Sequence, residues 1–321
     1  MKKIFILILI TALMLLSCKN NSTNVDTDNN GSSTETQEEL DKYGIDIDTA
    51  TKEIIEEALN KYYQDKGEYK LIFKGTSTKV YDGMKNGDTI AGMVENTKIK
   101  NVVISAEHVI FENNKIKDST FGGDQNYNTT IVKITIPDTI TTIGKDAFVC
   151  ANLTNVNMPK NLKTIEDGAF YEMKMEELIL PEGLETIGAS AFRISTFTNL
   201  VIPNSVISIG EKAFDSCKKL TKVKLPNSIK TLETSIFASC YALKSITIPA
   251  SVTEIKRSAF YYSTGLESVT FLSQNPPTIG QSAFAGTVLK TIYVPQGSQK
   301  QYETLKGKYG IPNSIEIIEQ Q

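Results

Sequence analysis

The chain has 321 residues, a formal net charge of −3, and a composition that is 40% hydrophobic and 22% charged. This composition is typical of a folded protein with a sizeable core, and the weakly acidic balance argues against the clustered basic surface of a nucleic-acid-binding protein. Tryptophan is absent and His108 is the only histidine. A site with several histidine ligands is therefore excluded, and histidine-based catalysis has one candidate.

The N-terminus has the pattern of a bacterial export signal. Two lysines precede an apolar run of 13 residues, Ile4 to Leu16, which is short for a membrane-spanning helix and typical of a signal-peptide core. The stretch Leu15 to Cys18 resembles the bacterial lipobox, and this resemblance implies cleavage before Cys18 and attachment of a lipid to it. We predict a lipoprotein signal peptide at residues 1–17. The alternatives are an ordinary secretory signal, or a short membrane anchor with a chance cysteine.

Residues 18–38 are predicted to form a flexible tether, because they are rich in Asn, Ser, Thr, Asp and Gln and nearly free of large apolar side chains. A multiply acylated Cys18 would hold such a tether firmly to a lipid bilayer. The residue after this cysteine is Lys19 rather than aspartate. By analogy with enterobacterial sorting, we expect an exported, membrane-anchored lipoprotein at the outer membrane or cell surface rather than at the inner membrane.

Residues 39–105 show no repeat. Apolar residues at helical spacing predict a helix within Thr49 to Tyr63, and short apolar runs predict strands at Tyr69 to Phe73 and Val102 to Ile104. A stack of repeats must cover its first apolar cross-section, so we interpret this segment as a small α/β N-terminal cap. The alternative is an independent binding domain.

From residue 106 to 295 the sequence repeats. Phenylalanines recur at spacings of 22, 22, 22, 23, 23 and 24 residues, at positions Phe148, Phe170, Phe192, Phe214, Phe237, Phe260 and Phe284. A proline ladder runs in step with them. In the unit Leu220 to Cys240, Val223 and Leu225 alternate as in a short strand with one buried face, and Pro226 ends that strand. A unit this short cannot bury its own apolar face, so neighbouring units must stack into a solenoid.

The repeat pattern, L-x-x-[VI]-x-[IL]-P followed by A-F-x-x-C-x-x-L, closely resembles the BspA-like leucine-rich repeats of bacterial surface proteins. The resemblance covers Phe121 to Val294 and implies a right-handed leucine-rich-repeat solenoid of about eight coils of 22–24 residues, with short parallel strands. It further implies adhesion to host matrix or to other cells. The pattern after Val294 looks like the terminal cap of this repeat family. Residues 296–321 are accordingly predicted to be a C-terminal cap, with a short helix at Gly297 to Lys306 and a strand at Ile315 to Ile318.

The cysteines Cys217 and Cys240 occupy the same slot of adjacent repeats. We interpret them as small buried apolar positions, and the alternative is a disulfide between neighbouring coils of an exported protein. Acidic residues recur before the Ala-Phe pair, but interspersed lysines such as Lys145, Lys212 and Lys256 indicate a mixed, solvated face rather than a calcium site. No catalytic residue, metal site or cofactor is predicted, and His108 is interpreted as a structural or surface residue.

Exposed strand positions of successive coils align into a candidate binding face on which a protein or glycan partner would dock. Its residues are Thr135, Asn157, Ile179, Val201, Lys222, Lys224, Thr247, Thr270 and Tyr293. Ile179 and Val201 are apolar neighbours on this face and would anchor a contact, although β-branched residues also simply favour strands. The leading hypothesis is a non-catalytic, lipid-anchored binding or adhesion surface. The alternatives are a passive structural or antigenic coat and, third, a hydrolase using the N-terminal module.

Overall fold

The computed structural model describes residues 35–80, 89–123, 130–149 and 153–320. The chain divides by its internal contacts into residues 1–34 and a second unit, Glu35–Gln321, and all the described helices and strands belong to the second unit. The predicted signal peptide and Cys18 lie outside the described residues. Among the described helices, none combines the length and the apolar character needed to cross a bilayer.

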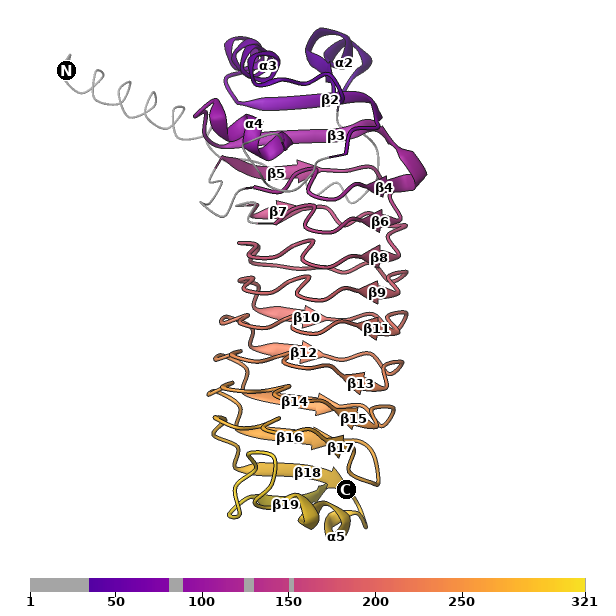
Figure 1. The fold of residues 1–321 in the computed structure, drawn as a ribbon, viewed down its shortest axis with the longest axis vertical. Coiled ribbons are helices and arrows are strands. Elements are labelled where there is room, and N and C mark those ends of the chain that lie inside the picture. Colours follow the sequence, from indigo (N-terminus) through magenta and orange to yellow (C-terminus); the bar gives the residue numbers. More distant parts are fainter. Residues whose placement is uncertain (1–34, 81–88, 124–129, 150–152, 321) are drawn as a thin grey trace, which may run out of the picture. The chain divides into compact units, whose positions relative to one another are not determined.

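The N-terminal module continues the repeat sheet rather than standing apart from it. Its helices and strands, in chain order, are α2 (Gln37–Tyr43), β1 (Gly44–Asp46), α3 (Lys52–Lys66), β2 (Lys70–Ser77), α4 (Ile90–Asn96) and β3 (Val102–Phe111). The sheet of the module runs directly into the first repeats, which contribute β5 (Ile131–Thr135) and β7 (Asn155–Val156): the strand order is β1-β2-β3-β5-β7, all parallel. One hydrophobic core extends from Ile47 to Ile317. The helices lie at the start of the stack of coils (Figure 1).

The start of the folded unit corrects the predicted end of the tether. The tether was expected to reach Glu38, but helix α2 begins at Gln37 and Glu35 is already buried. The reason is a capping box: the Thr36 side chain accepts a hydrogen bond from the Glu39 amide, and the Glu39 side chain accepts one from the Thr36 amide. This motif satisfies two free amides of the first turn and so fixes where the helix begins.

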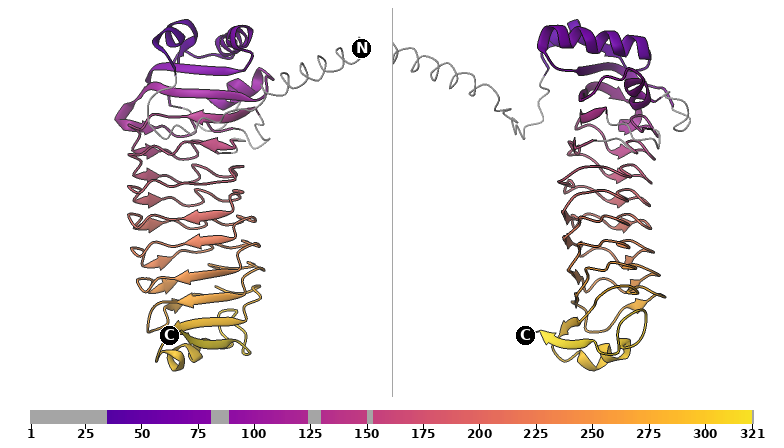
Figure 2. Two further views of the ribbon diagram at one scale, coloured as in Figure 1. Left: turned by 180° about the vertical axis from the view of Figure 1, so that it is seen from behind. Right: turned by 90° about the vertical axis from the view of Figure 1, so that its left-hand side faces the viewer.

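Most repeats contribute two short strands rather than the single strand recognised in the sequence. The first strand column consists of β5 (Ile131–Thr135), β7 (Asn155–Val156), β10 (Asn199–Val201), β12 (Lys222–Lys224), β14 (Ser245–Ile248), β16 (Ser268–Phe271) and β18 (Thr291–Pro295). The second strand column consists of β4 (Lys115–Ile116), β6 (Thr142–Ile143), β8 (Thr164–Ile165), β9 (Thr186–Ile187), β11 (Ser208–Ile209), β13 (Thr231–Leu232), β15 (Glu254–Ile255) and β17 (Thr278–Ile279). All their pairings are parallel. Figure 2 shows the two columns from behind and from the side.

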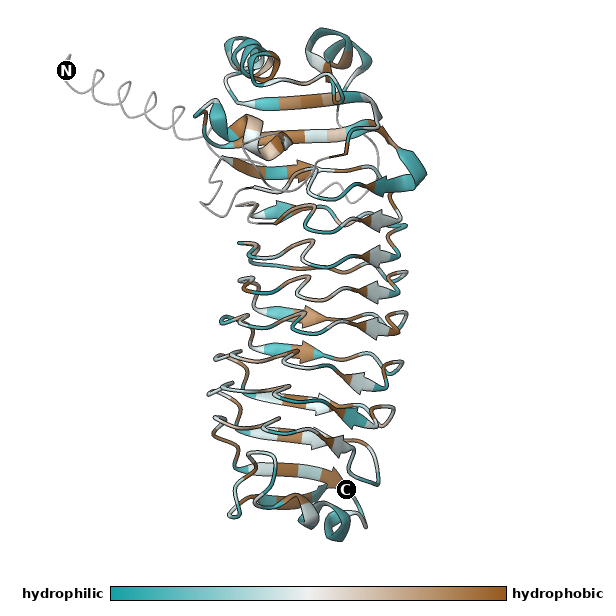
Figure 3. Ribbon diagram, in the orientation of Figure 1, coloured by the Kyte–Doolittle hydropathy of each residue, from teal (hydrophilic) through white to brown (hydrophobic). Residues whose placement is uncertain are grey.

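The interior of the solenoid is organised by the phenylalanine ladder. Eight rings, from Phe121 to Phe284, stack with centroids 5.1 to 5.9 Å apart and planes within 13° of parallel. Each ring is at most 1% exposed. Apolar residues alternate with polar ones along the strands (Figure 3), as expected of strands with one face on the core. The prediction of a leucine-rich-repeat solenoid of about eight stacked coils is thus confirmed.

The last coil is closed by a compact cap. It contains α5 (Gln299–Tyr302), the 3-10 helix η2 (Glu303–Leu305) and β19 (Glu316–Gln320), which pairs in parallel with β18. The Tyr302 ring is buried against Phe271 at 5.1 Å, and its hydroxyl donates to the carbonyl oxygens of Ser273 at 2.9 Å and Asn275 at 3.1 Å. These bonds tie the loop between β16 and β17 to the cap.

Candidate functional site

The candidate binding face runs along the first strand column, where its side chains are exposed or, at Thr135, Thr270 and Tyr293, half-buried. The strand register places Val201 beside Lys224 in one part of the column, and Thr247, Thr270 and Tyr293 side by side in another. Each of these side chains alternates with buried neighbours, so the residues share one face of the sheet. The register also adds Ile318 of β19, 41% exposed, beside Tyr293. That residue lies in the cap and was not included in the predicted face.

The most apolar part of this face lies at Ile179 and Val201. Their side chains are 71% and 55% exposed, well above what the pleat of an ordinary half-buried strand requires. Lys222 and Lys224 follow on the next coil, in register with Asn199 and Val201. The structure therefore places the predicted apolar pair on the surface, with the two lysines on the next coil.

Asn157, another member of the predicted face, is occupied by the fold. Its side-chain oxygen accepts from the Ile136 amide and its side-chain nitrogen donates to the Ile136 carbonyl, both at 3.0 Å. The side chain thereby supplies two bonds that a neighbouring strand would otherwise make. Its amide serves to link two coils, and a partner would have to compete with both bonds.

The first strand column is hollowed at the coil that holds residues 177–180. This coil has no strand in the first column, and the sheet that ends at β7 is not joined to the pair β10-β12. A hollow of about 380 Å³ opens here. We call it the coil-3 groove; it is lined by Glu176, Glu177, Leu178, Ile179, Leu180, Glu182, Thr198, Asn199, Val201 and Pro203.

The cysteine slot is a hydrogen-bonding position. Cys217 and Cys240 are free, buried thiols whose sulfurs lie 3.2 and 3.3 Å from the carbonyl oxygens of Phe192 and Phe214. Burial raises the pKa of both thiols, so they remain protonated donors. In two other repeats a serine hydroxyl makes the same bond, from Ser195 to Phe170 and from Ser263 to Phe237. The slot therefore selects a small side chain that can donate to a phenylalanine carbonyl, a requirement that the apolar interpretation missed. Cys150 lies outside the described residues.

His108 belongs to a buried ionic cluster in the N-terminal module. The carboxylate of Glu35 accepts from Lys70 at 2.7 Å and from the Ser105 hydroxyl at 3.1 Å, and lies 3.4 Å from Nε2 of His108. Burial would raise the pKa of Glu35, but the hydrogen bond and charge of Lys70, followed by Ser105 and His108, lower it below its ordinary value. The Ser105 side chain is buried and its hydroxyl is directed to the carboxylate. This arrangement anchors the start of the folded unit to the sheet and offers no accessible nucleophile.

A second hollow, of about 500 Å³, opens on the N-terminal module beside α2 and α3. Its charged side chains neutralise one another: Lys42 pairs with Asp65 and Lys66 with Glu39, both at 2.8 Å. These are exposed ion pairs, which contribute little to stability. His108 is not among the lining residues. The hydrolase hypothesis called for polar groups converging on His108 or on acidic residues; this hollow holds acidic residues, two of them paired with lysines, and lies apart from His108.

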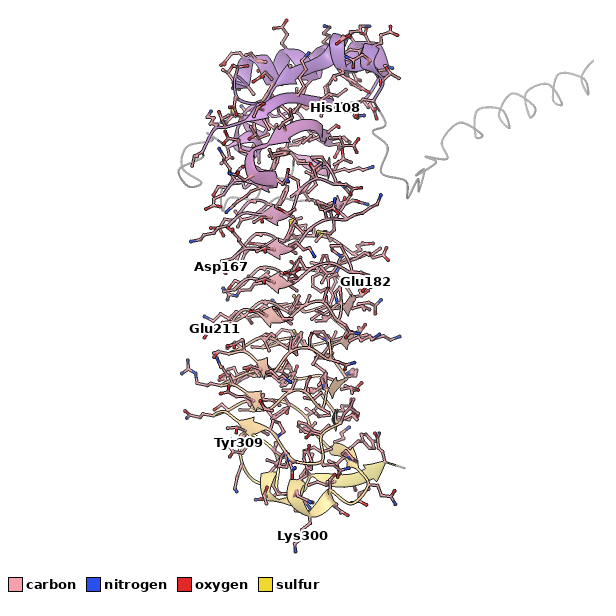
Figure 4. All side chains as sticks on the ribbon, turned by 90° about the vertical axis from the view of Figure 1, so that its right-hand side faces the viewer. His108, Asp167, Glu182, Glu211, Lys300 and Tyr309 are labelled. Atoms are coloured by element: carbon pink, nitrogen blue, oxygen red, sulfur yellow. The ribbon has the colours of Figure 1, made fainter. Side chains whose placement is uncertain are left out.

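Three of the acidic residues that recur in the turns pair with lysines of other coils. Glu166 lies 2.7 Å from Lys115, Glu185 lies 2.9 Å from Lys163, and Glu233 lies 2.8 Å from Lys256. Asp167 and Glu211 lie along one edge of the solenoid, and Glu182, which lines the coil-3 groove, lies along the opposite edge (Figure 4). Over the described ranges, no three or more His, Cys, Asp or Glu side chains are grouped so that they could hold a metal ion.

Comparison with known proteins agrees with this geometry. The model of the BspA-type leucine-rich repeat region matches residues 93–196 and 185–305, in six copies. A leucine-rich repeat protein from Bacteroides ovatus is 32% identical, with a TM-score of 0.50; the match covers 57% of this chain and 47% of that protein, so the chain spans about half its length. A leucine-rich repeat protein from Eubacterium ventriosum is 21% identical over 70% of this chain and 67% of its own, with a TM-score of 0.48.

A third solved structure, the leucine-rich repeat protein of T. pallidum, is 23% identical over 66% of this chain and 87% of its own, with a TM-score of 0.44. No curated protein matches the chain. The family model covers well over half of the sequence, and its matched residues coincide with the stacked phenylalanines and the paired short strands. The chain therefore belongs to the BspA-type leucine-rich repeat family.

Proposed function

We propose that the protein is an exported lipoprotein, anchored to a membrane through acylated Cys18, whose repeat sheet binds a protein or glycan partner without catalysis. The observation that carries the proposal is the exposed apolar pair Ile179 and Val201 on the candidate binding face. Burying such a pair against a partner contributes roughly 25 cal/mol per Å² of apolar area, before the costs of association. A solenoid presents this face continuously across its coils, which suits an extended partner.

Two substitutions on the candidate binding face test the binding role. Val201→Asp and Tyr293→Asp, made separately in the full chain, are compared for binding to purified host matrix proteins and to the glycans those proteins carry. We expect at least one of them to weaken binding tenfold or more, because a charge at a buried contact is costly to desolvate. Ile207→Asp is the matched control, since Ile207 is 66% exposed but precedes β11 in the second strand column. Equal binding by all three variants would favour a passive coat.

The anchor is tested separately. Cells expressing the wild type or Cys18→Ser are labelled with an alkyne fatty acid, and the membrane fraction is examined for labelled protein. We expect label and membrane association in the wild type and neither in the variant, since stable anchoring takes more than one acyl chain and the cysteine would carry them. Proteolysis of intact cells then reports which side of the envelope the solenoid faces. An unlabelled wild type would favour the ordinary secretory signal.

A further inference from the structure

The coil-3 groove differs in chemistry from the rest of the candidate binding face. Its lining holds three carboxylates, Glu176, Glu177 and Glu182, and no cationic side chain. Within the part of the chain that the structure describes, none of the three takes part in an ion pair. By contrast, Glu166, Glu185 and Glu233 of the turns each have a lysine partner. The groove thus carries uncompensated negative charge beside an apolar floor.

Charge and polarity follow an order along the stack. In one exposed row, Glu177 is followed one coil later by Asn199 and two coils later by Lys222. In the neighbouring row, Ile179 is followed by Val201 and then by Lys224. A ligand that crosses these three coils therefore meets carboxylates first, an apolar surface in the middle and two ammonium groups at the far end.

We propose that the coil-3 groove and the two lysines beyond it form a docking site for an extended peptide segment with a basic residue, an apolar residue two positions away, and an acidic residue two positions further on. In an extended segment these three side chains share one face. The ends of such a segment lie about 13 Å apart, while two coil steps cover about 10 Å. The long lysine and glutamate side chains accommodate this difference. The proposal rests on the proposed function, of which it specifies the partner.

Charge complementarity decides the choice of occupant. The basic residue would lie against Glu176, Glu177 and Glu182, where like-charged groups would be repelled. The apolar residue would cover Ile179 and Val201, and the acidic residue would meet Lys222 and Lys224. A purely anionic partner would be repelled by the carboxylates of the groove. A purely cationic partner would be repelled by the two lysines.

The probes are three fluorescent peptides, flanked by Gly-Ser, with the cores Lys-Ser-Ile-Ser-Glu, Glu-Ser-Ile-Ser-Glu and Lys-Ser-Ser-Ser-Glu. Each is titrated against the detergent-solubilised full chain at low ionic strength, where exposed charges interact most strongly. We expect the first peptide to bind at least tenfold more tightly than the other two. Similar affinity for all three, or no saturable binding of the first, overturns the proposal.

Variants of the full chain assign the effect to the groove. Glu177→Lys is expected to weaken the first peptide tenfold and to strengthen the second, and Ile179→Ser is expected to remove the advantage of the first peptide over the third. The matched controls are Glu316→Lys and Ile318→Ser, which lie in the same two rows of the sheet at the C-terminal cap. Equal effects of control and test variants overturn the assignment.

Two outcomes separate this inference from the broader proposal. If Tyr293→Asp abolishes partner binding while Glu177→Lys and Ile179→Ser leave it intact, the face binds the partner and the groove does not. If the peptides discriminate as expected but no matrix partner binds, the groove is a peptide site and the adhesion role fails. Thermal unfolding of each variant shows whether it is folded. Glu177, Ile179, Glu316 and Ile318 are exposed and Tyr293 is half-buried, so Tyr293→Asp needs this check most.

Discussion

The phenylalanine ladder makes a quantitative prediction about stability. Phe214 is fully buried between Phe192 at 5.7 Å and Phe237 at 5.5 Å, and Phe197 lies edge-on at 6.4 Å. Truncating a buried phenylalanine to alanine costs about 3–5 kcal/mol, and each aromatic pair contributes about 0.5–1.5 kcal/mol beyond area burial. We expect Phe214→Ala to lower the free energy of unfolding by about 4–5 kcal/mol. Among the aromatic rings that the structure describes, Phe284 stacks on that of Phe260 alone, at 5.2 Å, so Phe284→Ala should cost about 1 kcal/mol less.

The assay is urea unfolding followed by far-ultraviolet circular dichroism. Coils contact mainly their neighbours, so a central lesion should also separate the transition of Phe214→Ala into two steps, one for the coils on each side. Phe214→Leu keeps most of the volume but loses the stacking on both neighbouring rings, and we expect it to cost about 1–3 kcal/mol. A loss for Phe214→Ala no greater than that for Phe284→Ala would show that the stacked rings do not act as a continuous support.

Three further predictions concern polar groups inside the fold. Cys217→Ser should change the free energy of unfolding by less than about 1 kcal/mol, whereas Cys217→Val should lower it by about 1–3 kcal/mol, because the carbonyl of Phe192 loses its donor; the same urea titration measures both. The pKa of Glu35 is lowered in the folded state, so its contribution to stability is fully present above the ordinary carboxyl pKa and is lost as the pH falls through the folded value. Melting temperatures of the wild type should therefore fall more steeply below pH 5 than those of Glu35→Gln, and identical pH profiles would contradict this coupling. Tyr302→Phe removes a buried hydroxyl that donates to two loop carbonyls and should lower the free energy of local opening of the C-terminal cap by about 1–3 kcal/mol. Relative to the wild type, amide hydrogen exchange should then accelerate more in β19 than in β10.

The repeat could be recognised from the sequence because the interior imposes strict spacing. Every coil places a phenylalanine on its neighbour's ring, and most coils therefore keep a spacing of 22–24 residues between these rings. The longer step of 27 residues from Phe121 to Phe148, whose rings still stack at 5.4 Å, shows that extra residues are tolerated in the loops between the rings. The second strand column was not recognised, because two-residue strands such as Thr164–Ile165 leave no alternating pattern to read. The donor role of the Cys217 slot was missed since cysteine is commonly buried as an apolar residue, and only its exchange with serine in other repeats signals a hydrogen bond.

Interactions between distant residues account for the remaining differences. Glu35 and Ser105 are 70 positions apart, and nothing in the local sequence of either indicates their contact. The predicted tether therefore extended too far, since its end is set by the contact of Glu35 with Ser105 together with the capping box of Thr36 and Glu39, and not by composition. The amide of Asn157 was likewise expected on an open face, whereas it bonds to the preceding coil.

The solenoid geometry explains why the sequence predicts the fold of this protein more readily than its binding partner. Inward positions of a solenoid are constrained by every neighbouring coil, while outward positions such as Ile179 and Glu177 have no packing requirement to meet. An exposed apolar side chain beside uncompensated carboxylates is thus not demanded by the fold, and it costs the isolated protein solubility without adding to its core. The coil-3 groove combines an exposed apolar side chain with uncompensated carboxylates on the candidate binding face. A partner should therefore be sought at this groove first.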